Sequence, residues 1–142
     1  MKDKQEFDCM MKATTSIALA TSVDDNPNVR IVNCCYDESR PGIVYFSSVR
    51  SNPKTIEFEK NSKVAFTTIP APSEGHVHIR TKTATVQKSK LSIDDVEKMF
   101  VEQIPGFDKS LAVIGRQLDI YEIHIKEAVI VYGPKQTGAV SF

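Results

Sequence analysis

The residues best suited to chemistry lie in one run, Ser47-Ser48-Val49-Arg50-Ser51-Asn52-Pro53-Lys54, between a predicted strand and a predicted helix. An Asn-Pro pair is typical of the start of a helix. The positive end of a helix favours anions, yet this one receives Arg50 and Lys54. Two cations, several hydroxyls and free helix amides together predict a phosphate-binding site. We call residues 47–54 the junction.

Arg30 adds positive charge at the start of another predicted strand, just after the Asn26-Pro27 turn. A guanidinium can form two parallel hydrogen bonds to a phosphate. Charge alone favours an ordinary solvated helix face for Arg50 and Lys54 over a phosphate site. The sequence contains no dinucleotide fingerprint, Walker loop, nucleophile elbow or zinc-protease helix, which argues against nucleoside-triphosphate chemistry.

Length and composition predict one domain, residues 1–142. The 18 basic and 18 acidic residues cancel, so no global field recruits nucleic acid or an anionic membrane, and phosphate recognition must be local. Cys9, Cys34 and Cys35 show no redox or zinc spacing, and adjacent Cys34 and Cys35 are expected on opposite strand faces as buried thiols. The charged start and the lack of a membrane-length apolar run predict a cytoplasmic protein.

Apolar periodicity and turn residues predict a mainly β fold, an antiparallel split barrel of six to seven strands with two or three short helices. Ile56 is expected to anchor the second helix inward, and one apolar run, 110–114, is ambiguous between helix and strand. A polar tail is expected after Gly133-Pro134. The predicted helices are 4–13, 53–59 and 92–102, and the predicted strands are 17–23, 28–36, 43–46, 64–69, 76–87, 119–125 and 128–132.

Four segments resemble, in order and spacing, the FMN-binding split barrel of the pyridoxamine 5'-phosphate oxidase-like family: Arg30-Ile31-Val32, Val44–Ser48, Ser51–Lys54 and Asn61–Phe66. The similarity spans almost the whole chain. In that family an arginine of the second strand, a serine or threonine and a junction lysine bind the FMN phosphate. The resemblance therefore assigns this role to Arg30, Ser48 and Lys54.

The resemblance also implies positions around the flavin ring. The backbone of residues 30–33 would run beside the isoalloxazine, and Ser47 and Ser48 would lie near its pyrimidine edge and the phosphate tail. His76 occupies a position from which related proteins present a glutamine or an aromatic residue toward the flavin. The chain lacks the tryptophan-containing C-terminal segment of the pyridoxamine phosphate oxidases proper, so that activity is not expected. The full predicted cofactor set is Arg30, Ile31, Val32, Asn33, Ser47, Ser48, Arg50, Ser51, Asn52, Lys54 and His76.

By the same resemblance the chain is expected to be a homodimer with FMN at the interface, acting as a flavin-dependent oxidoreductase between a nicotinamide donor and a small acceptor. No catalytic side chain is assigned, because the flavin supplies the redox chemistry. Two alternatives stay open: a flavin carrier or sensor, and a haem-binding barrel with His76, His78 or His124 as the iron ligand. A metal site built from the three histidines is disfavoured, because no carboxylate or thiol completes it. Alanine at Arg30 or Lys54 is expected to weaken FMN binding with little loss of stability.

Overall fold

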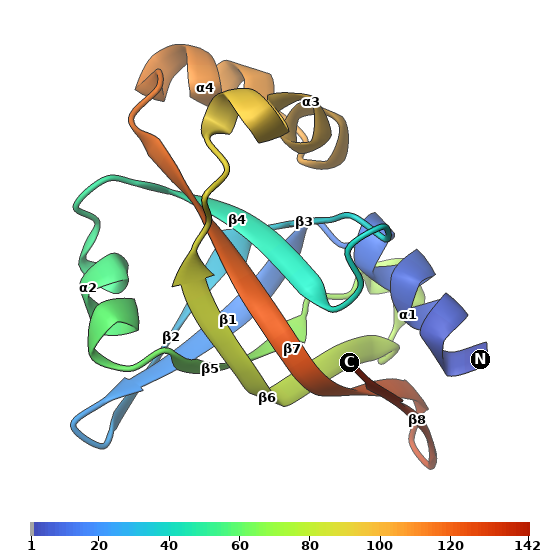
Figure 1. The fold of residues 1–142 in the computed structure, drawn as a ribbon. Helices are drawn as coiled ribbons and strands as arrows, with labels where there is room; N and C mark the ends of the chain where they lie inside the picture. Colours follow the sequence, from blue (N-terminus) through green and yellow to red (C-terminus); the bar gives the residue numbers. More distant parts are fainter. Residues whose placement is uncertain (1) are drawn as a thin grey trace.

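The computed structural model describes residues 2–142 and shows a strongly curled antiparallel sheet with helices packed around it (Figure 1). The sheet order is β2-β1-β5-β6-β7-β4-β3, and β8 pairs with β7. The strands are β1 Ser16–Val23, β2 Asn26–Asn33, β3 Cys35–Tyr36, β4 Ile43–Val49, β5 Lys63–Thr68, β6 His78–Lys88, β7 Leu118–Gly133 and β8 Gln136–Ser141. The helices are α1 Lys2–Ala13, α2 Pro53–Lys60, α3 Ile93–Gln103 and α4 Phe107–Ile114, with a 3₁₀ turn at Pro72–Glu74.

The barrel is split between strands β2 and β3. These strands stand at opposite ends of the sheet order, although a single residue, Cys34, separates them in sequence. The sheet therefore curls back on itself, and β2 keeps one edge without a strand partner. The predicted mainly β split barrel is confirmed, with eight strands and four α-helices in the described chain in place of six to seven and two or three.

Two apolar clusters stabilise this arrangement. The larger fills the barrel and includes Phe46 of β4 and Phe7 of α1, while the smaller lies beneath α3 and α4 around Tyr45. Cys34 belongs to the first cluster and Cys35 to the second, which confirms that they point to opposite faces. Burial raises the pKa of Cys34 to about 12, so its thiol stays protonated and unreactive at neutral pH. None of the described helices has the length and hydropathy needed to span a bilayer.

Local signals place the elements next to the junction. Asp24 and Asp25, with φ of 52° and 64°, form the two-residue turn between β1 and β2, because aspartate tolerates the left-handed region better than most residues. Asn52 begins α2 as its N-cap, its side chain accepting from the Lys54 amide at 3.1 Å. The hairpin and the helix are thus fixed independently and meet through their side chains.

The orientation of α2 differs from the sequence prediction. Ile56 is 52% exposed, whereas Thr55 and Phe58 are buried. The Thr55 hydroxyl donates to the Asn52 carbonyl at 2.7 Å, and Phe58 packs against Phe46 in the barrel core. The larger aromatic ring, not the isoleucine, therefore decides which face of the helix is inward.

Other differences concern β6, β7, α4 and β8; the predicted strands 119–125 and 128–132 form the single strand β7. Simple alternation along β6 predicts that Thr83 shares a face with Thr81. A register shift between Arg80 and Thr83 instead turns Thr83 outward, and Ala84 is the buried residue. Residues 110–114, whose periodicity is ambiguous, form the last part of helix α4. Gly106 and Gly115, both at positive φ, flank this helix. The polar tail forms β8, paired with the last part of β7.

Candidate functional site

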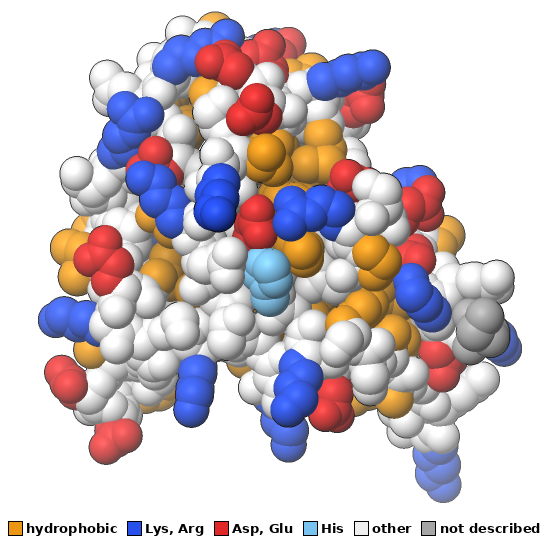
Figure 2. All heavy atoms as spheres, in the orientation of Figure 1, with side chains coloured by type: hydrophobic (Ala, Val, Ile, Leu, Met, Phe, Trp, Pro, Cys, Tyr) orange, Lys and Arg blue, Asp and Glu red, His pale blue; other side chains and the backbone are white. Residues whose placement is uncertain are grey.

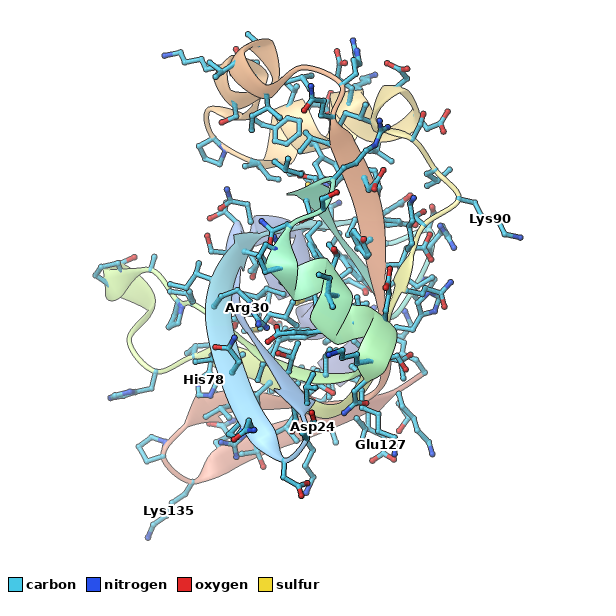
Figure 3. The ribbon with its side chains drawn as sticks, turned by 90° about the vertical axis from the view of Figure 1, so that its left-hand side faces the viewer. Asp24, Arg30, His78, Lys90, Glu127 and Lys135 are labelled. Atoms are coloured by element: carbon cyan, nitrogen blue, oxygen red, sulfur yellow. The ribbon has the colours of Figure 1, made fainter. Side chains whose placement is uncertain are left out.

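Arg30 lies on strand β2 beside helix α2 (Figure 3), and Lys54 lies in the first turn of that helix, near enough to feel the Arg30 charge. Lys54 is half-buried, and burial followed by the nearby Arg30 charge lowers its pKa. Among the described side chains Lys54 has no ion-pair partner within 4 Å. Two cations close together with one unpaired suit an anionic ligand.

Arg30 is held in place by the fold itself. Its Nη1 donates to the Thr21 hydroxyl at 2.9 Å and to the Leu19 carbonyl at 3.3 Å, and its Nη2 donates to the Glu57 carboxylate. A guanidinium has five N–H donors, so these three bonds leave two for a ligand. The side chain is therefore preorganised, with spare donors beside Lys54.

The junction divides into separate parts. Arg50 forms an ion pair with Asp119 of β7 at 3.1 Å and has no contact with Arg30 among the ion pairs of the described residues. Ser48 is 3% exposed and its hydroxyl donates to the Val49 carbonyl at 3.4 Å, whereas Ser47 is half-buried. Ser51 has a left-handed backbone with φ of 67°, which turns the chain into α2. The structure thus brings Arg30 and Lys54 together but does not add Arg50 to them.

The amides at the start of α2 are largely satisfied within the protein. Asn52 caps the Lys54 amide, the Thr55 amide donates to the Asn52 carbonyl at 3.0 Å, and Pro53 has no N–H. An anion here is consequently recognised by the side chains of Arg30 and Lys54 more than by the helix end. This differs from the sequence expectation, which relied on free helix amides.

The segment 30–33 lies on the open edge of the sheet. Arg30 and Val32 face inward, while Ile31 is 67% exposed and Asn33 is also on the outside. Asn33 accepts a hydrogen bond from the Ser16 hydroxyl at 3.2 Å. Because β2 has a strand partner on one side only, the backbone of residues 30–33 has no strand partner along its other edge.

The three histidines do not form a cluster. His76 is exposed in the turn before β6, and its carbonyl lies 2.6 Å from Nδ1 of His78. His124 on β7 instead contacts the buried carboxylate of Glu122, with Nε2 at 2.8 Å from Oε1. No group of three metal-ligating side chains occurs among the described residues. His76 is therefore placed on a loop, apart from the contacts that join Arg30 to α2.

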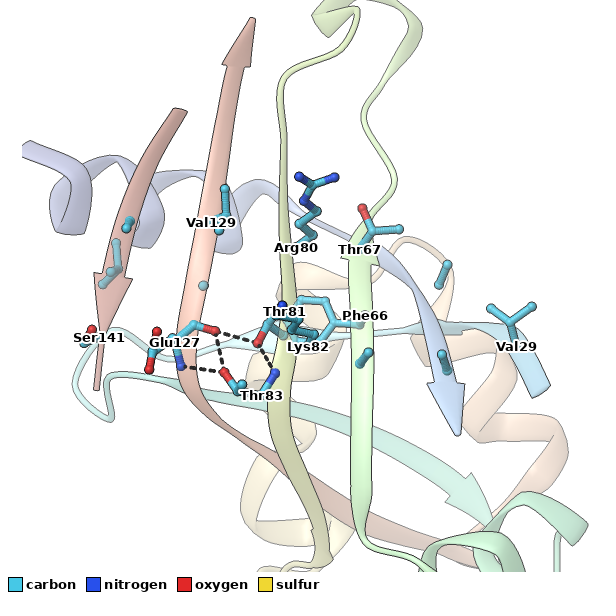
Figure 4. Close-up of a pocket in the computed structure, with 16 residues that line it drawn as sticks. Val29, Phe66, Thr67, Arg80, Thr81, Lys82, Thr83, Glu127, Val129 and Ser141 are labelled. Atoms are coloured by element: carbon cyan, nitrogen blue, oxygen red, sulfur yellow. Dashed lines mark hydrogen bonds between the residues drawn. The ribbon is translucent and has the colours of Figure 1, made fainter. Parts of the chain in front are cut away.

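A cleft of about 580 Å³ lies on the outer face of the sheet (Figure 4). Its wall is mainly small apolar side chains, with Arg80, Lys82 and Glu127 as charged members, and hydroxyls of Thr81 and Thr83 donate to the Glu127 carbonyl across the β6 bulge. No predicted cofactor residue lines it. The apolar lining residues include Ala18, Ala20, Val29, Ala65, Val129 and Ala139.

The cleft and the Arg30 contacts lie on the two faces of the same edge strand. Val29 lines the cleft, and the next residue, Arg30, points to the other side toward α2. The edge of β2 is therefore the border between an apolar surface and a cationic one.

Glu57 is the site residue that sequence reasoning missed. It lies 27 residues from Arg30, and their contact depends on how α2 docks against the hairpin. The sequence did contain one indication of this role: Glu57 follows Lys54 by three residues, so the two side chains share a helix face.

The antiparallel sheet is curled and is split beside β2, where Arg30 lies. This architecture defines a split-barrel protein. A family model described as pyridoxamine 5'-phosphate oxidase-like matches residues 10–136. The chain therefore belongs to the pyridoxamine 5'-phosphate oxidase-like family. A sequence comparison with curated proteins finds no match.

Solved structures share this fold at low sequence identity. ChuZ from Campylobacter jejuni superposes with a TM-score of 0.76 at 11% identity, over 99% of this chain and 59% of that one. A haem-binding protein from Mycobacterium smegmatis gives 0.69 at 9% identity, over 91% of this chain and 53% of that one. A FAD-binding protein from Mesorhizobium loti gives 0.63 at 13% identity, over 95% and 90%. The chain thus spans little more than half of the first two.

Proposed function

We propose that this chain binds FMN, with Arg30 and Lys54 holding the phosphate and the open edge of β2 running beside the ring. The observation that carries the proposal is the half-buried, unpaired Lys54 beside an Arg30 that keeps two free donors. Ser48 and His76 keep the roles that the family resemblance gives them. The flavin would supply the redox chemistry, and the protein its orientation and its exposure to solvent.

We further propose that two copies form the complete site. One barrel of this size does not enclose a tricyclic ring, whereas a two-fold interface creates concave sites without more chain. The apolar cleft next to Val29 supports this, because a second copy would bury its alanine and valine side chains. On the face drawn in Figure 2, basic and acidic side chains are interspersed, which suits a small ligand better than nucleic acid.

As to activity, we propose a cytoplasmic flavin-dependent oxidoreductase that takes electrons from NADH or NADPH and passes them to a small acceptor. The FAD-binding protein of the same fold supports a flavin. The haem-binding protein of the same fold makes haem the second candidate. A flavin carrier without fast turnover would use the same phosphate contacts.

Spectroscopy of the purified protein separates these functions. We expect a flavin absorption spectrum, or saturable quenching of added FMN, and bleaching when NADH or NADPH is added without oxygen. Persistent yellow colour with both donors would favour a carrier or a different electron donor. A Soret band on adding haem, with no response to FMN, would overturn the flavin proposal.

Replacing Lys54 with alanine tests the phosphate contact most cleanly. We expect FMN binding to weaken by about 1.5 to 3 kcal/mol, the range for a charge-assisted hydrogen bond. Stability should change little, because Lys54 has no ion pair to lose. The measurement is a titration of FMN fluorescence, with Lys60→Ala, an exposed lysine at the other end of α2, as the matched control. Equal affinities for the two variants would contradict the assigned contact.

A further inference from the structure

The Glu57 carboxylate lies where it opposes an incoming phosphate. Its Oε2 accepts from Arg30 and, at 3.2 Å, from the Thr21 hydroxyl, while its Oε1 accepts from Asn28 Nδ2 at 3.2 Å. Three donors thus hold one carboxylate on the guanidinium that is assigned to the cofactor. These hydrogen bonds and the Arg30 charge keep the pKa of Glu57 below its usual range. The carboxylate is therefore charged at neutral pH.

The fold builds this arrangement from three elements. Asn28 and Arg30 are two residues apart on β2 and share a face, and Thr21 stands opposite Asn28 in the β1–β2 register. Glu57 reaches them from α2, one turn after Lys54. The carboxylate is thus a fixed bridge between helix and hairpin, and not a freely moving surface side chain.

The three charged side chains of this site, Arg30, Lys54 and Glu57, carry a net charge of about +1. Arg30 and Lys54 contribute two positive charges, and Glu57 cancels one. An FMN phosphate carries about 1.5 to 2 negative charges at neutral pH. To bind, it must share Arg30 with Glu57 and approach a second anion, and both effects reduce its affinity.

We propose that Glu57 is a built-in counter-ion that weakens phosphate binding and so keeps the cofactor exchangeable. The proposal rests on the proposed function, since it assumes that Arg30 and Lys54 receive the FMN phosphate. Without ligand, Glu57 satisfies Arg30 and stabilises the fold. With ligand, the same carboxylate speeds the release of FMN.

The test is Glu57→Gln. The amide oxygen can still accept from Arg30 and Thr21, whereas the amide NH2 replaces the oxygen that accepts from Asn28, so the negative charge and one hydrogen bond are removed. We expect FMN to bind about tenfold more tightly and to dissociate more slowly. Riboflavin, which lacks the phosphate, should bind both proteins alike. Glu59→Gln, which removes the same charge from an exposed position on the same helix, should leave FMN affinity unchanged.

The outcomes are distinguishable by FMN fluorescence titration and stopped-flow release. Unchanged or weaker FMN binding in Glu57→Gln, while Lys54→Ala still weakens it, would show that Glu57 only positions Arg30; the counter-ion proposal would fail and the FMN site would stand. No FMN binding by the wild type, or no effect of Lys54→Ala, would overturn both. Thermal melting in inorganic phosphate is a second readout: phosphate should stabilise Glu57→Gln at lower concentration than the wild type, and equal dependence would count against the proposal.

Discussion

Replacing Arg30 with alanine is expected to cost both cofactor affinity and stability. FMN affinity should fall by about 1.5 to 3 kcal/mol, as for Lys54, because a charged donor to the phosphate is lost. The free energy of unfolding should also fall, by about 1 to 3 kcal/mol, because Glu57, Thr21 and the Leu19 carbonyl each lose a hydrogen-bond donor. Urea denaturation of the ligand-free protein measures the second effect, and FMN titration the first.

A double variant isolates the cause of the stability loss. In Arg30→Ala the Glu57 carboxylate keeps its charge without its cationic partner, whereas in Arg30→Ala with Glu57→Gln that unpaired carboxylate is gone. We therefore expect the double variant to be more stable than Arg30→Ala alone. A double variant no more stable than the single one would show that the ion pair contributes little.

This expectation corrects the one drawn from sequence, where alanine at Arg30 was expected to leave stability almost unchanged. The sequence showed a cation on a strand, and such side chains are usually solvated. It did not show that Thr21, one strand away, and Glu57, on a later helix, surround that cation. Lys54 keeps the original expectation because it has no such partners among the described side chains.

What the sequence predicted well was set by local chemistry. Asn52 and Pro53 specify the start of α2, and the Ser92–Asp95 capping box specifies the start of α3. The two aspartates between β1 and β2 specify their hairpin. These signals act within a few residues of chain, so no knowledge of the rest of the fold is needed to interpret them.

The features that the sequence predicted poorly depend on contacts between distant segments of the chain. Strand β8 has a weak pattern of its own and is held by pairing with β7 and by Asp3 of α1, whose carboxylate accepts from the Ala139 amide at 3.4 Å. Ile56 was placed inward by residue type, but the docking of Phe58 against the barrel decided otherwise. Glu57 was missed for the same reason, since its partners are chosen by the way α2 docks.

A buried carboxylate outside the cofactor contacts, that of Glu122, is expected to stabilise the fold. Glu122 of β7 is 5% exposed. Its carboxylate accepts hydrogen bonds from Ser89 Oγ at 2.6 Å and from His124 Nε2 at 2.8 Å, and it forms an ion pair with Arg40 Nη1 at 3.5 Å. Burial alone raises the pKa of Glu122, but the bonds from Ser89 and His124 and the Arg40 charge outweigh it. The pKa of Glu122 is consequently lower than usual.

Replacing Glu122 with alanine is expected to lower the free energy of unfolding by about 3 kcal/mol, because a cation and two hydrogen-bonding side chains lose their shared partner. A carboxylate with a depressed folded pKa adds stability above its unfolded pKa of about 4.3 and loses that contribution as pH falls through the folded value. The difference between variant and wild type should therefore be full at pH 7 and shrink in acid below about pH 4. Urea denaturation at both pH values measures this. Glu127→Ala, an exposed carboxylate on the same strand, is the control, and an equal loss in both variants would contradict the assigned role of Glu122.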